Sequence, residues 1–539
     1  MKSFFFLIMF SCTFLLTSCT HSSISTTILA DSFISARDHS TRLTNQPFKS
    51  VRDAYIYKPI ILQKEPIPTL SYQVHSEIPV VEDSFLFPES YTELPGIYTF
   101  RGNHLRTAPA YGTFHTKTLE LASSWTFQTN SHHKWGGGAG WTGQPSIVKW
   151  DQDMLEMMNV YKEFKKKDNL VEVIYGSLDG SVYFLDLETG KKTRDSIYIG
   201  GPIKGSVTID PRGYPLLYVG QGIPDHSPIG YRIFSLLNGE MLHFIEGIDS
   251  KAYRKWGAFD GSALINRETD QLIIAGENGL FYKITLHTQF DKEARTILVE
   301  PKTVKWSYQI DGNPYQGIEN SVSIYKNIAY FADNGGSVIA LDLQDMQPIF
   351  ALPKTDDTDA TIVIEPEQDI PMIYTGTEVD HQGSKGNALI RKIHGLTGKV
   401  MWKTDYPAYS IPDVNGGVLA TPIIGKNDIS ELVIFSIARY NTLQSGLLVA
   451  LNKETGEEIW KRELDHYAWS SPIDVYSEEG TSYIVQAESA GNIHFIEGSS
   501  GKILDTIHLN SNIEATPAIY ENKIVVANRG GEIHCVVIQ

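Results

Sequence analysis

The sequence has few cysteines and therefore little capacity for disulfide bonding. Cys12, Cys19 and Cys535 are its only cysteines in 539 residues, and two of them fall in the first 19. No disulfide framework can hold the remaining chain together, so an apolar core must do so. Cys535 stands in the strand-like run EIHCVVIQ, where we expect a small buried apolar residue rather than a reactive thiol.

Basic residues are also scarce. The chain has 46 Lys and Arg against 63 Asp and Glu, which gives a formal net charge of -17. Such a surface repels phosphate backbones, so we expect no nucleic-acid partner. The composition, 42% hydrophobic and 20% charged, is that of a globular protein with ample material for a core.

Several catalytic signatures are missing from the sequence. It contains no HExxH, GxSxG or Walker phosphate-binding motif, and no CxxCH for covalent haem attachment. These absences argue against the common metalloprotease, serine hydrolase, nucleotide-hydrolysing and cytochrome c chemistries. We therefore expect a non-catalytic protein.

Long apolar runs are confined to the N-terminus. The run FFFLIMFSCTFLL is short for a membrane-spanning helix, and Leu16-Thr17-Ser18-Cys19 follows it. This ending resembles the lipobox of bacterial lipoproteins, which implies a signal peptide at 1–18 and a membrane anchor of acyl chains on Cys19. An ordinary signal peptide or a membrane helix is the alternative. We expect a tether at 19–90, rich in Ser, Thr and Pro, and a lead-in segment at 91–120 that packs on the main domain.

One phrase recurs along the rest of the chain. LVALNKETGEEIWKREL from Leu448 has counterparts in VYFLDLETGKKTRD from Val182 and IRKIHGLTGKVMWKTD from Ile390. Each is an apolar strand, a Thr-Gly turn and a returning strand, which is hairpin chemistry. A lone hairpin is marginal in water, so recurrence predicts copies that bury one another.

The repeat predicts an all-β, eight-bladed β-propeller over 121–539. Each copy has four strands and spans on the order of 40–55 residues, the size of a propeller blade. The last copy ends one strand short, and the strand LASSWTFQT from Leu121 has no partner of its own. We therefore expect the N-terminal strand to complete the C-terminal blade and close the ring.

The Thr-Gly turn followed by Trp resembles the tryptophan-docking repeat of quinoprotein-like propellers. That resemblance implies that the Trp of one blade docks on the next. Relatives include the pyrroloquinoline quinone (PQQ) dehydrogenases and the propeller lipoprotein of the outer-membrane β-barrel assembly machine. Many alcohol-oxidising relatives stack the quinone beneath a disulfide of adjacent cysteines, which this chain cannot form.

The loops that enter each innermost strand are rich in aromatic and polar residues, and we expect them to crowd one face of the ring. A pocket there could bind a planar or sugar-like ligand, and Asp260, Glu319 and Asn320 offer oxygen atoms to Ca²⁺. The alternative is that propeller rims are polar in any case. The candidate ligand-binding residues are Trp135, Trp141, Lys204, Trp256, Asp260, Tyr315, Glu319, Asn320, Asn415, Trp469 and Glu514.

We expect a monomeric scaffold that binds a protein partner. The resemblance to the assembly-machine lipoprotein would make that partner a membrane β-barrel assembly component. No cofactor or metal is expected. The alternatives are a PQQ- and Ca²⁺-dependent alcohol or sugar dehydrogenase and a carbohydrate-binding envelope lipoprotein. Residues after Cys19 read THSSIS without an acidic cluster, which favours the periplasmic face of the outer membrane.

Overall fold

The computed structural model describes residues 69–76, 85–116, 118–140, 143–412 and 414–539, with the backbone of strand β1 (Thr26–Ile28). The predicted signal peptide at 1–18, the acylation site Cys19 and most of the 19–90 extension lie outside these residues. Within the described ranges, no helix is long and apolar enough to cross a membrane.

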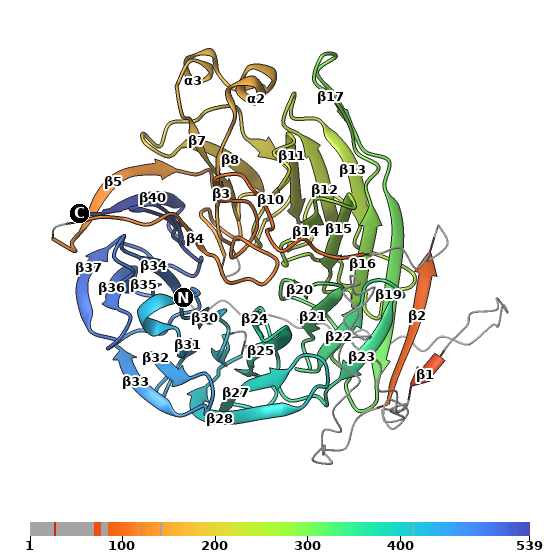
Figure 1. The fold of residues 1–539 in the computed structure, drawn as a ribbon, viewed down its shortest axis with the longest axis vertical. Helices are drawn as coiled ribbons and strands as arrows, with labels where there is room; N and C mark the ends of the chain where they lie inside the picture. Colours follow the sequence, from red (N-terminus) through yellow and green to blue (C-terminus); the bar gives the residue numbers. More distant parts are fainter. Residues whose placement is uncertain (1–25, 29–68, 77–84, 117, 141–142, 413) are drawn as a thin grey trace, which may run out of the picture.

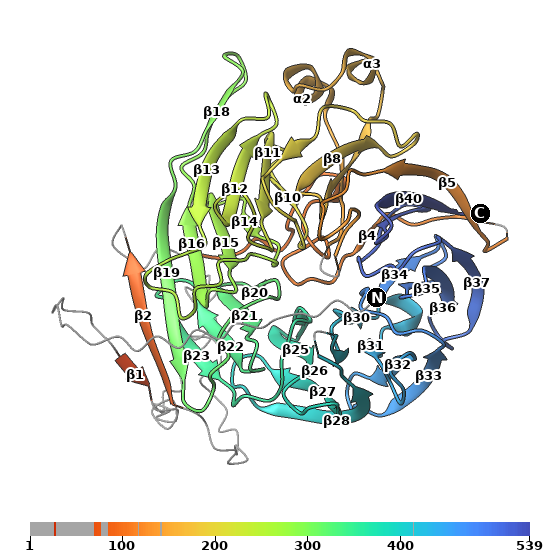
Figure 2. The same cartoon turned by 180° about the vertical axis from the view of Figure 1, so that it is seen from behind.

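The described chain forms an eight-bladed β-propeller, as the repeat predicts. Eight sheets of four or more strands stand around one axis, antiparallel except for one short parallel pair, and a small hairpin makes a ninth sheet. Figures 1 and 2 show the blades following one another around the ring in chain order. We number the blades 1 to 8 in that order.

In every blade the strands run antiparallel from the axis outward. Blade 1 is β6 (Ser146–Lys149), β7 (Val171–Gly176), β8 (Ser181–Asp186) and β9 (Ile197–Tyr198), with β3 (Gly96–Ile97) beside β6. Blade 2 is β10 (Thr208–Ile209), β11 (Leu216–Gly220), β12 (Gly230–Ser235) and β13 (Met241–Glu246). Blade 3 is β14 (Leu264–Asn266), β15 (Gln271–Ala275), β16 (Leu280–Thr285) and β19 (Lys302–Ile310), extended outward by β2 (Leu70–Ser76) and β1. Blade 4 is β20 (Ser323–Tyr325), β21 (Ile328–Ala332), β22 (Val338–Asp342) and β23 (Gln347–Ala351).

The second half of the ring repeats this plan. Blade 5 is β24 (Val363–Glu367), β25 (Ile370–Gly376), β27 (Lys385–His394) and β28 (Val400–Tyr409). Blade 6 is β30 (Ile423–Ile424), β31 (Leu432–Ala438), β32 (Gly446–Asn452) and β33 (Glu458–Leu464), joined by β29 (Gly416–Gly417) and β26 (Glu378–Val379). Blade 7 is β34 (Ile473–Tyr476), β35 (Ser482–Ala487), β36 (Asn492–Glu497) and β37 (Ile503–His508). Blade 8 is β38 (Ala518–Tyr520), β39 (Lys523–Ala527), β40 (Glu532–Ile538) and β5 (Leu121–Gln128), with β4 (Ala110–Tyr111) beside β38.

Other elements decorate the rim. The hairpin of β17 (Gln289–Asp291) and β18 (Thr296–Leu298) projects from blade 3. The polar insertion in blade 1 forms two short helices, α2 (Gln152–Met157) and α3 (Lys162–Lys165), and a 3-10 turn, η2 (Asn427–Ile429), lies in blade 6.

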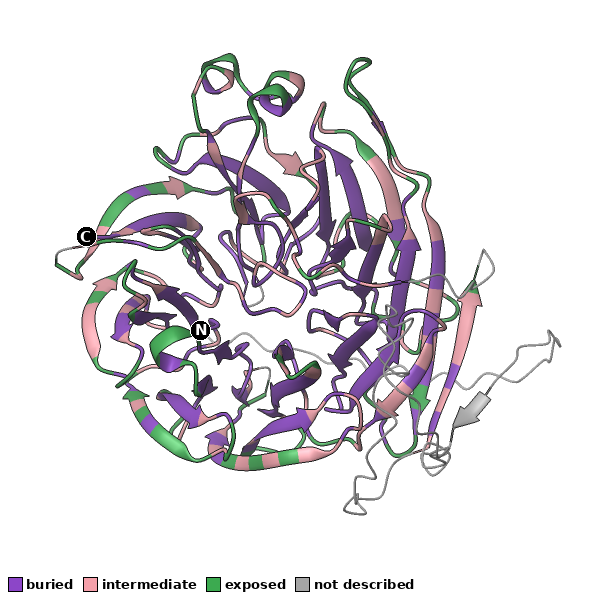
Figure 3. Cartoon of the chain, in the orientation of Figure 1, coloured by how far each residue is buried: buried purple, intermediate pink, exposed green. Residues whose placement is uncertain are grey.

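Burial follows the position of a strand in its blade. The middle strands β8 and β12 are buried at every position, since other blades cover both of their faces. The outer strand β33 alternates between exposed and buried residues. Figure 3 shows the same gradient around the ring, with exposed residues gathered on the outer strands and loops. The packed faces between blades therefore form the core.

The ring closes through its N-terminal strand. Strand β5 pairs antiparallel with β40 from Leu121 opposite Ile538 to Gln128 opposite Glu532. Cys535 lies opposite Trp125 and is a buried free thiol. The predicted closure is thus confirmed, and it leaves blade 8 with a full set of strands.

Tryptophan docking joins neighbouring blades. The indole N–H of Trp402 in blade 5 donates to the Lys453 carbonyl of blade 6 at 2.8 Å, and Trp460 of blade 6 donates to the Gly498 carbonyl of blade 7 at 3.1 Å. The Trp402 ring lies only 2.7 Å from the position that a Cβ atom on residue 456 would occupy, so a side chain there would crowd the ring. The turn glycine has a φ of +73°, so it serves both the turn and the docked ring.

A belt of hydroxyl groups connects the innermost strands. The backbone N–H of Ser321 donates to the Thr361 hydroxyl at 3.0 Å, that of Thr361 to Thr421 at 3.2 Å, and that of Thr421 to Ser471 at 2.9 Å. Each bond crosses from one blade to the next. The belt explains why a small hydroxyl residue opens the innermost segment of these blades.

A segment before the first blade fills the axis of the ring. Arg101 and Arg106 are fully buried. The Arg101 guanidinium donates to the carbonyls of Pro422 and Pro472 at 2.7 Å each, and Arg106 donates to the Val322 carbonyl at 2.9 Å. We call residues 99–107 the plug, because their side chains bridge blades on opposite sides of the axis.

Candidate functional site

One face of the ring carries two clusters of carboxylate side chains. In an antiparallel blade, the turn between the second and third strands and the connection to the next blade leave from the same end. We call this end the loop face. Its exposed apolar side chains include Ile248, Tyr253, Trp256, Tyr315 and Ile411 on the connections between blades, and Leu443 on the turn between β31 and β32.

A first cluster of carboxylates on the loop face surrounds a lysine. Oxygen atoms of Asp260, Glu277 and Glu319 lie within 4.8 Å of one another. The Lys204 ammonium pairs directly with Asp260 and lies 3.8 Å from Glu277 and 4.0 Å from Glu319. Arg254 adds a second cation, 3.0 Å from Glu277. This cluster is therefore largely neutralised by the protein itself.

A second cluster lies in blade 5 and its connections. Oxygen atoms of Asp357, Asp359 and Glu378 also lie within 4.8 Å of one another. Asn415 donates its side-chain N–H to Oε2 of Glu378 at 2.9 Å, and the indole of Trp469 donates to the Asn415 carbonyl at 3.2 Å. The second cluster thus connects blades 5, 6 and 7.

Burial shifts the acid–base behaviour of both clusters. Desolvation, with repulsion from Glu319 and Asp260, raises the pKa of Glu277 well above its usual value. Desolvation and the neighbouring Asp359 do the same to the pKa of Glu378. Burial disfavours the Lys204 ammonium, but the combined attraction of Asp260, Glu277 and Glu319 outweighs burial and raises the lysine pKa.

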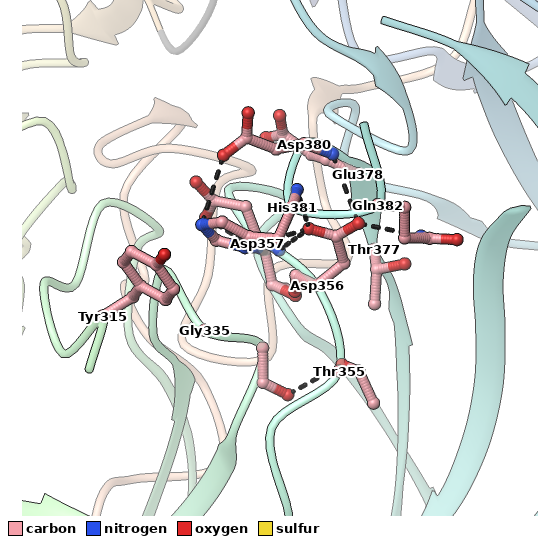
Figure 4. A network of polar contacts seen from close by, with 12 residues as sticks. Tyr315, Gly335, Thr355, Asp356, Asp357, Thr377, Glu378, Asp380, His381 and Gln382 are labelled. Carbon is pink, nitrogen blue, oxygen red and sulfur yellow. Dashed lines mark hydrogen bonds and ion pairs between the residues drawn. The ribbon is translucent and has the colours of Figure 1, made fainter. Parts of the chain in front are cut away.

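A polar network holds the second cluster in place. Asp356 accepts the backbone N–H of His381 at 2.8 Å and the side-chain N–H of Gln382 at 2.8 Å. The His381 ring also stacks on Tyr315, with centroids 4.0 Å apart. Figure 4 shows Asp356 beneath the 378–382 loop, with Tyr315 approaching from the neighbouring blade.

The axis offers little room for a ligand below the second cluster. A cavity of about 10 Å³ lies between Phe100 of the plug, Asp359 and the hydroxyl belt. That volume admits about one water molecule. It does not admit a quinone ring system.

The structure brings together some of the predicted site residues. Lys204, Asp260 and Glu319 share the first cluster, while Asn415 and Trp469 support the second. Tyr315 and Trp256 are exposed on the loop face, 43% and 38% respectively.

Other predicted residues lie apart from these clusters. Glu514 pairs with Arg529 at 3.6 Å in blade 8. Trp135 lies against the Lys134 ammonium, 4.9 Å from the ring centroid, and Trp141 lies outside the described residues.

Asn320 has a structural role that the sequence did not indicate. Its amide N–H donates to the carbonyls of Ala332 and Thr358 at 2.8 Å each, and its oxygen accepts the Ala332 N–H at 3.3 Å. With Asp260 already paired to Lys204, the set of Asp260, Glu319 and Asn320 does not fit Ca²⁺ beside a quinone.

Sequence reasoning missed four of the clustered carboxylates: Glu277, Asp357, Asp359 and Glu378. The run Asp356-Asp357-Thr358-Asp359 is a visible signal, since three carboxylates so close together repel one another unless something holds them. Glu277 and Glu378 each follow the second strand of a blade, where a turn directs them to the loop face.

Comparison with known proteins gives one family. Residues 444–537 match the family described as outer membrane protein assembly factor BamB. The proteins of that name from Kangiella koreensis and Shewanella oneidensis are 29% identical over 105 residues and 23% identical over 144 residues. These matches span 19% and 26% of this chain and 26% and 30% of the relatives, so the chain spans under a third of the relatives it matches.

Among solved structures, the quinohemoprotein alcohol dehydrogenase ADHIIG from Pseudomonas putida HK5 is similar in fold. It has a TM-score of 0.56 at 10% identity, covering 82% of this chain and 80% of that one. Such a likeness shows the propeller fold alone. The described chain is thus a PQQ-like propeller that resembles, through its C-terminal blades, the outer membrane protein assembly factor BamB.

Proposed function

We propose that this chain is a non-catalytic, protein-binding propeller of the cell envelope that takes part in outer-membrane protein assembly. The match of residues 444–537 to the assembly-factor family is the observation that carries the proposal. The partner would be a membrane β-barrel protein or a component that inserts one. The propeller would act as a monomer.

The loop face supplies a surface of suitable chemistry. Trp256 and Tyr315 expose 38% and 43% of their area there, and Tyr253 exposes 39%. The Tyr253 hydroxyl donates to the Pro314 carbonyl, so the loops of blades 3 and 4 are tied together. Rigid, exposed aromatic side chains with a polar surround are typical anchors of protein interfaces.

The filled axis supports binding over catalysis. Arg101 and Arg106 close the axis with hydrogen bonds to inner-strand carbonyls, and the cavity above them is about 10 Å³. A rigid ring of this kind presents loops without holding a cofactor at its centre.

Acylation of Cys19 would tether the ring to the periplasmic face of the outer membrane. The motif Leu16-Thr17-Ser18-Cys19 supports this part of the proposal. Several acyl chains give the stable anchoring that one chain does not. The extension at 19–90 would then link the anchor to the propeller and allow the loop face to contact a partner at some distance from the membrane surface.

Site-directed photo-crosslinking tests the proposal. A photoreactive residue replaces Tyr315 on the loop face in the full chain, and adducts from intact envelopes are identified by mass spectrometry. We expect an adduct with a β-barrel outer-membrane protein or a component of its assembly machinery. Trp256→Ala should reduce that adduct severalfold, since it removes a neighbouring anchor.

Met401 provides the matched control. It is 44% exposed but lies on β28 at the circumference of the ring. A probe there should give little of the same adduct. Equal adducts at both positions, or no assembly protein at Tyr315, would contradict a loop-face scaffold.

A further inference from the structure

We propose that Asp357, Asp359 and Glu378 form a divalent-cation site of the kind that Ca²⁺ takes. The site lies on the loop face at blade 5 and goes beyond the proposed function, because it requires neither a quinone nor a protein partner. Three features carry it: the spacing of the carboxylates, the buried oxygens of two of them that accept from no N–H or hydroxyl group, and the lack of an ion-paired Lys, Arg or His among the described residues.

The spacing suits one shared ion. The three carboxylates offer oxygens within 4.8 Å of one another. Ca²⁺ binds oxygen at roughly 2.3–2.6 Å, so ligands on opposite sides of the ion are about 5 Å apart. A single ion between the three side chains would thus reach all of them with little rearrangement.

Two of the carboxylates have a buried oxygen that no N–H or hydroxyl group reaches. Glu378 is fully buried, and its Oε1 accepts from no such donor while Oε2 accepts from Asn415. Its carboxyl group also lies close enough to that of Asp359 for the two to share a proton, which a bound cation would replace. Asp359 is 9% exposed, and its Oδ1 likewise accepts from no N–H or hydroxyl group. A buried carboxylate oxygen without a donor is costly, and a bound cation would satisfy it.

The charge balance separates this cluster from its neighbour. Lys204 and Arg254 lie within 4.0 Å of carboxylates of the first cluster. Among the described residues, no Lys, Arg or His nitrogen comes that close to Asp357, Asp359 or Glu378, although Lys204 attracts the Asp359 carboxylate from farther away. The nearby His381 is instead engaged by Asp356, at 3.0 Å, and by Asp380, at 3.3 Å.

The backbone around the cluster is already ordered. The N–H of Glu378 donates to the Asp357 carbonyl at 2.8 Å, which ties the two ligand-bearing loops together. Asp356 adds bonds from the backbone N–H groups of Asp380, at 3.2 Å, and His381, at 2.8 Å. Ligands held by supporting hydrogen bonds bind an ion without a large ordering cost.

The ligand set selects the class of ion. All three donors are carboxylate oxygens, which suit hard cations such as Ca²⁺ and Mg²⁺ rather than Zn²⁺ or Cu²⁺. Mg²⁺ demands near-ideal octahedral geometry at shorter distances, whereas Ca²⁺ tolerates irregular sets. We therefore assign the site to Ca²⁺.

Calorimetric titration of the full chain tests the assignment. The protein, purified in detergent and freed of metal with EDTA, is titrated with CaCl₂ alone. We expect one Ca²⁺ per chain and a higher melting temperature with Ca²⁺. Glu378→Gln should weaken binding at least tenfold, and Asp359→Asn serves as an independent second variant if the first does not fold.

Glu488 is the matched control. It is 1% exposed in the corresponding turn of blade 7, with an unpartnered Oε2, but belongs to neither cluster. Glu488→Gln should leave Ca²⁺ affinity within twofold of the parent. No binding at millimolar Ca²⁺, or loss of binding in Glu277→Gln but not in Glu378→Gln, would overturn the site. Neither result affects the photo-crosslinking experiment at Tyr315. The cation site can therefore be disproved without disproving the proposed function, and the reverse also holds.

Discussion

At the residue scale, Arg101 shows how one side chain can hold a ring together. It is fully buried, yet its guanidinium donates to carbonyl oxygens and not to a carboxylate. The carbonyls of Pro422 and Pro472 belong to the segments that enter blades 6 and 7, so one side chain connects two blades. A planar group with five donors suits this task.

Arg101→Met should destabilise the propeller strongly. The change leaves the Pro422 and Pro472 carbonyls without their Arg101 donors, at about 1–3 kcal/mol for each unsatisfied group, so about 2–6 kcal/mol in total. Urea unfolding followed by tryptophan fluorescence measures the loss. Arg462→Met is the control, because its Nε makes one bond, to the Gly501 carbonyl, on a partly exposed strand. A loss no greater than in this control would show that the plug does not brace the ring.

The carboxylates Glu277 and Glu378 are the other decisive single residues. Their pKa values are raised well above normal, first by burial and then by neighbouring carboxylates. The native state therefore keeps protons that the unfolded chain releases near pH 4.5. Stability that these groups contribute is lost as the pH rises above that value, until the native carboxyls ionise as well.

In EDTA, the free energy of unfolding should consequently fall between pH 5 and pH 8. The slope cannot exceed about 1.4 kcal/mol per pH unit for each such group. Chemical denaturation at several pH values measures it, and Glu378→Gln should flatten the slope, since glutamine does not titrate. If the free energy of unfolding of the parent protein rose between pH 5 and pH 8, the predicted direction of the pH dependence would be wrong.

At the scale of elements, the contact between a Trp and a turn glycine is the repeated joint. Trp125, Trp402 and Trp460 each lie 2.7 Å or less from where a Cβ would stand on Gly190, Gly456 and Gly501. Each indole also donates to a carbonyl of the next blade. The Thr-Gly or Ser-Gly turn of one blade and the Trp of its neighbour therefore form one interaction between consecutive copies of the repeat.

Gly456→Ala should destabilise the protein by about 3 kcal/mol. A left-handed backbone costs a non-glycine residue about 1–2 kcal/mol, and crowding of the Trp402 ring adds about 1–3 kcal/mol. Gly312→Ala isolates the backbone effect, because Gly312 also has a positive φ, +77°, but nothing lies within 4 Å of its Cβ position. We expect about 1 kcal/mol for that control by thermal or urea unfolding. Equal losses of unfolding free energy in the two variants would show that crowding of the Trp402 ring contributes nothing.

At the scale of the whole molecule, the ring depends on residues from both ends of the described chain. Strand β5 supplies the outer strand of blade 8, and the plug that precedes it braces the axis. Contacts of this kind join segments roughly 400 residues apart, as in the hydrogen bond of Gln128 to Gly531. Closing so long a loop carries an entropic cost, which the packing between the other blades must offset.

A chain that begins at residue 129 should not melt cooperatively. It lacks β5 and the plug, so the edge of β40 and the inner-strand carbonyls lose their partners. A chain that begins at residue 85 keeps both and should retain a single transition, although it loses β2 from the rim of blade 3. Differential scanning calorimetry compares the two. A cooperative transition in the shorter chain would mean that seven complete blades suffice.

The fold followed from local patterns because each blade repeats the same short-range chemistry. Alternation, turn glycines and the placing of Trp are all readable within a copy, and the missing strand at one end matched the extra strand at the other. The candidate site was only partly predictable. Lys204, Asp260 and Glu319 could be named from their loops, but which carboxylates share a space could not.

The sequence by itself therefore determined the propeller, its blade number and its closure, since these rest on periodicity and turn chemistry. Only the tertiary structure decided that Arg101 and Arg106 fill the axis, that Asn320 binds backbone groups, and that Asp357, Asp359 and Glu378 meet. The reason is physical: burial and charge balance depend on residues brought together by the curvature of the whole ring, and no local pattern in the chain records that proximity.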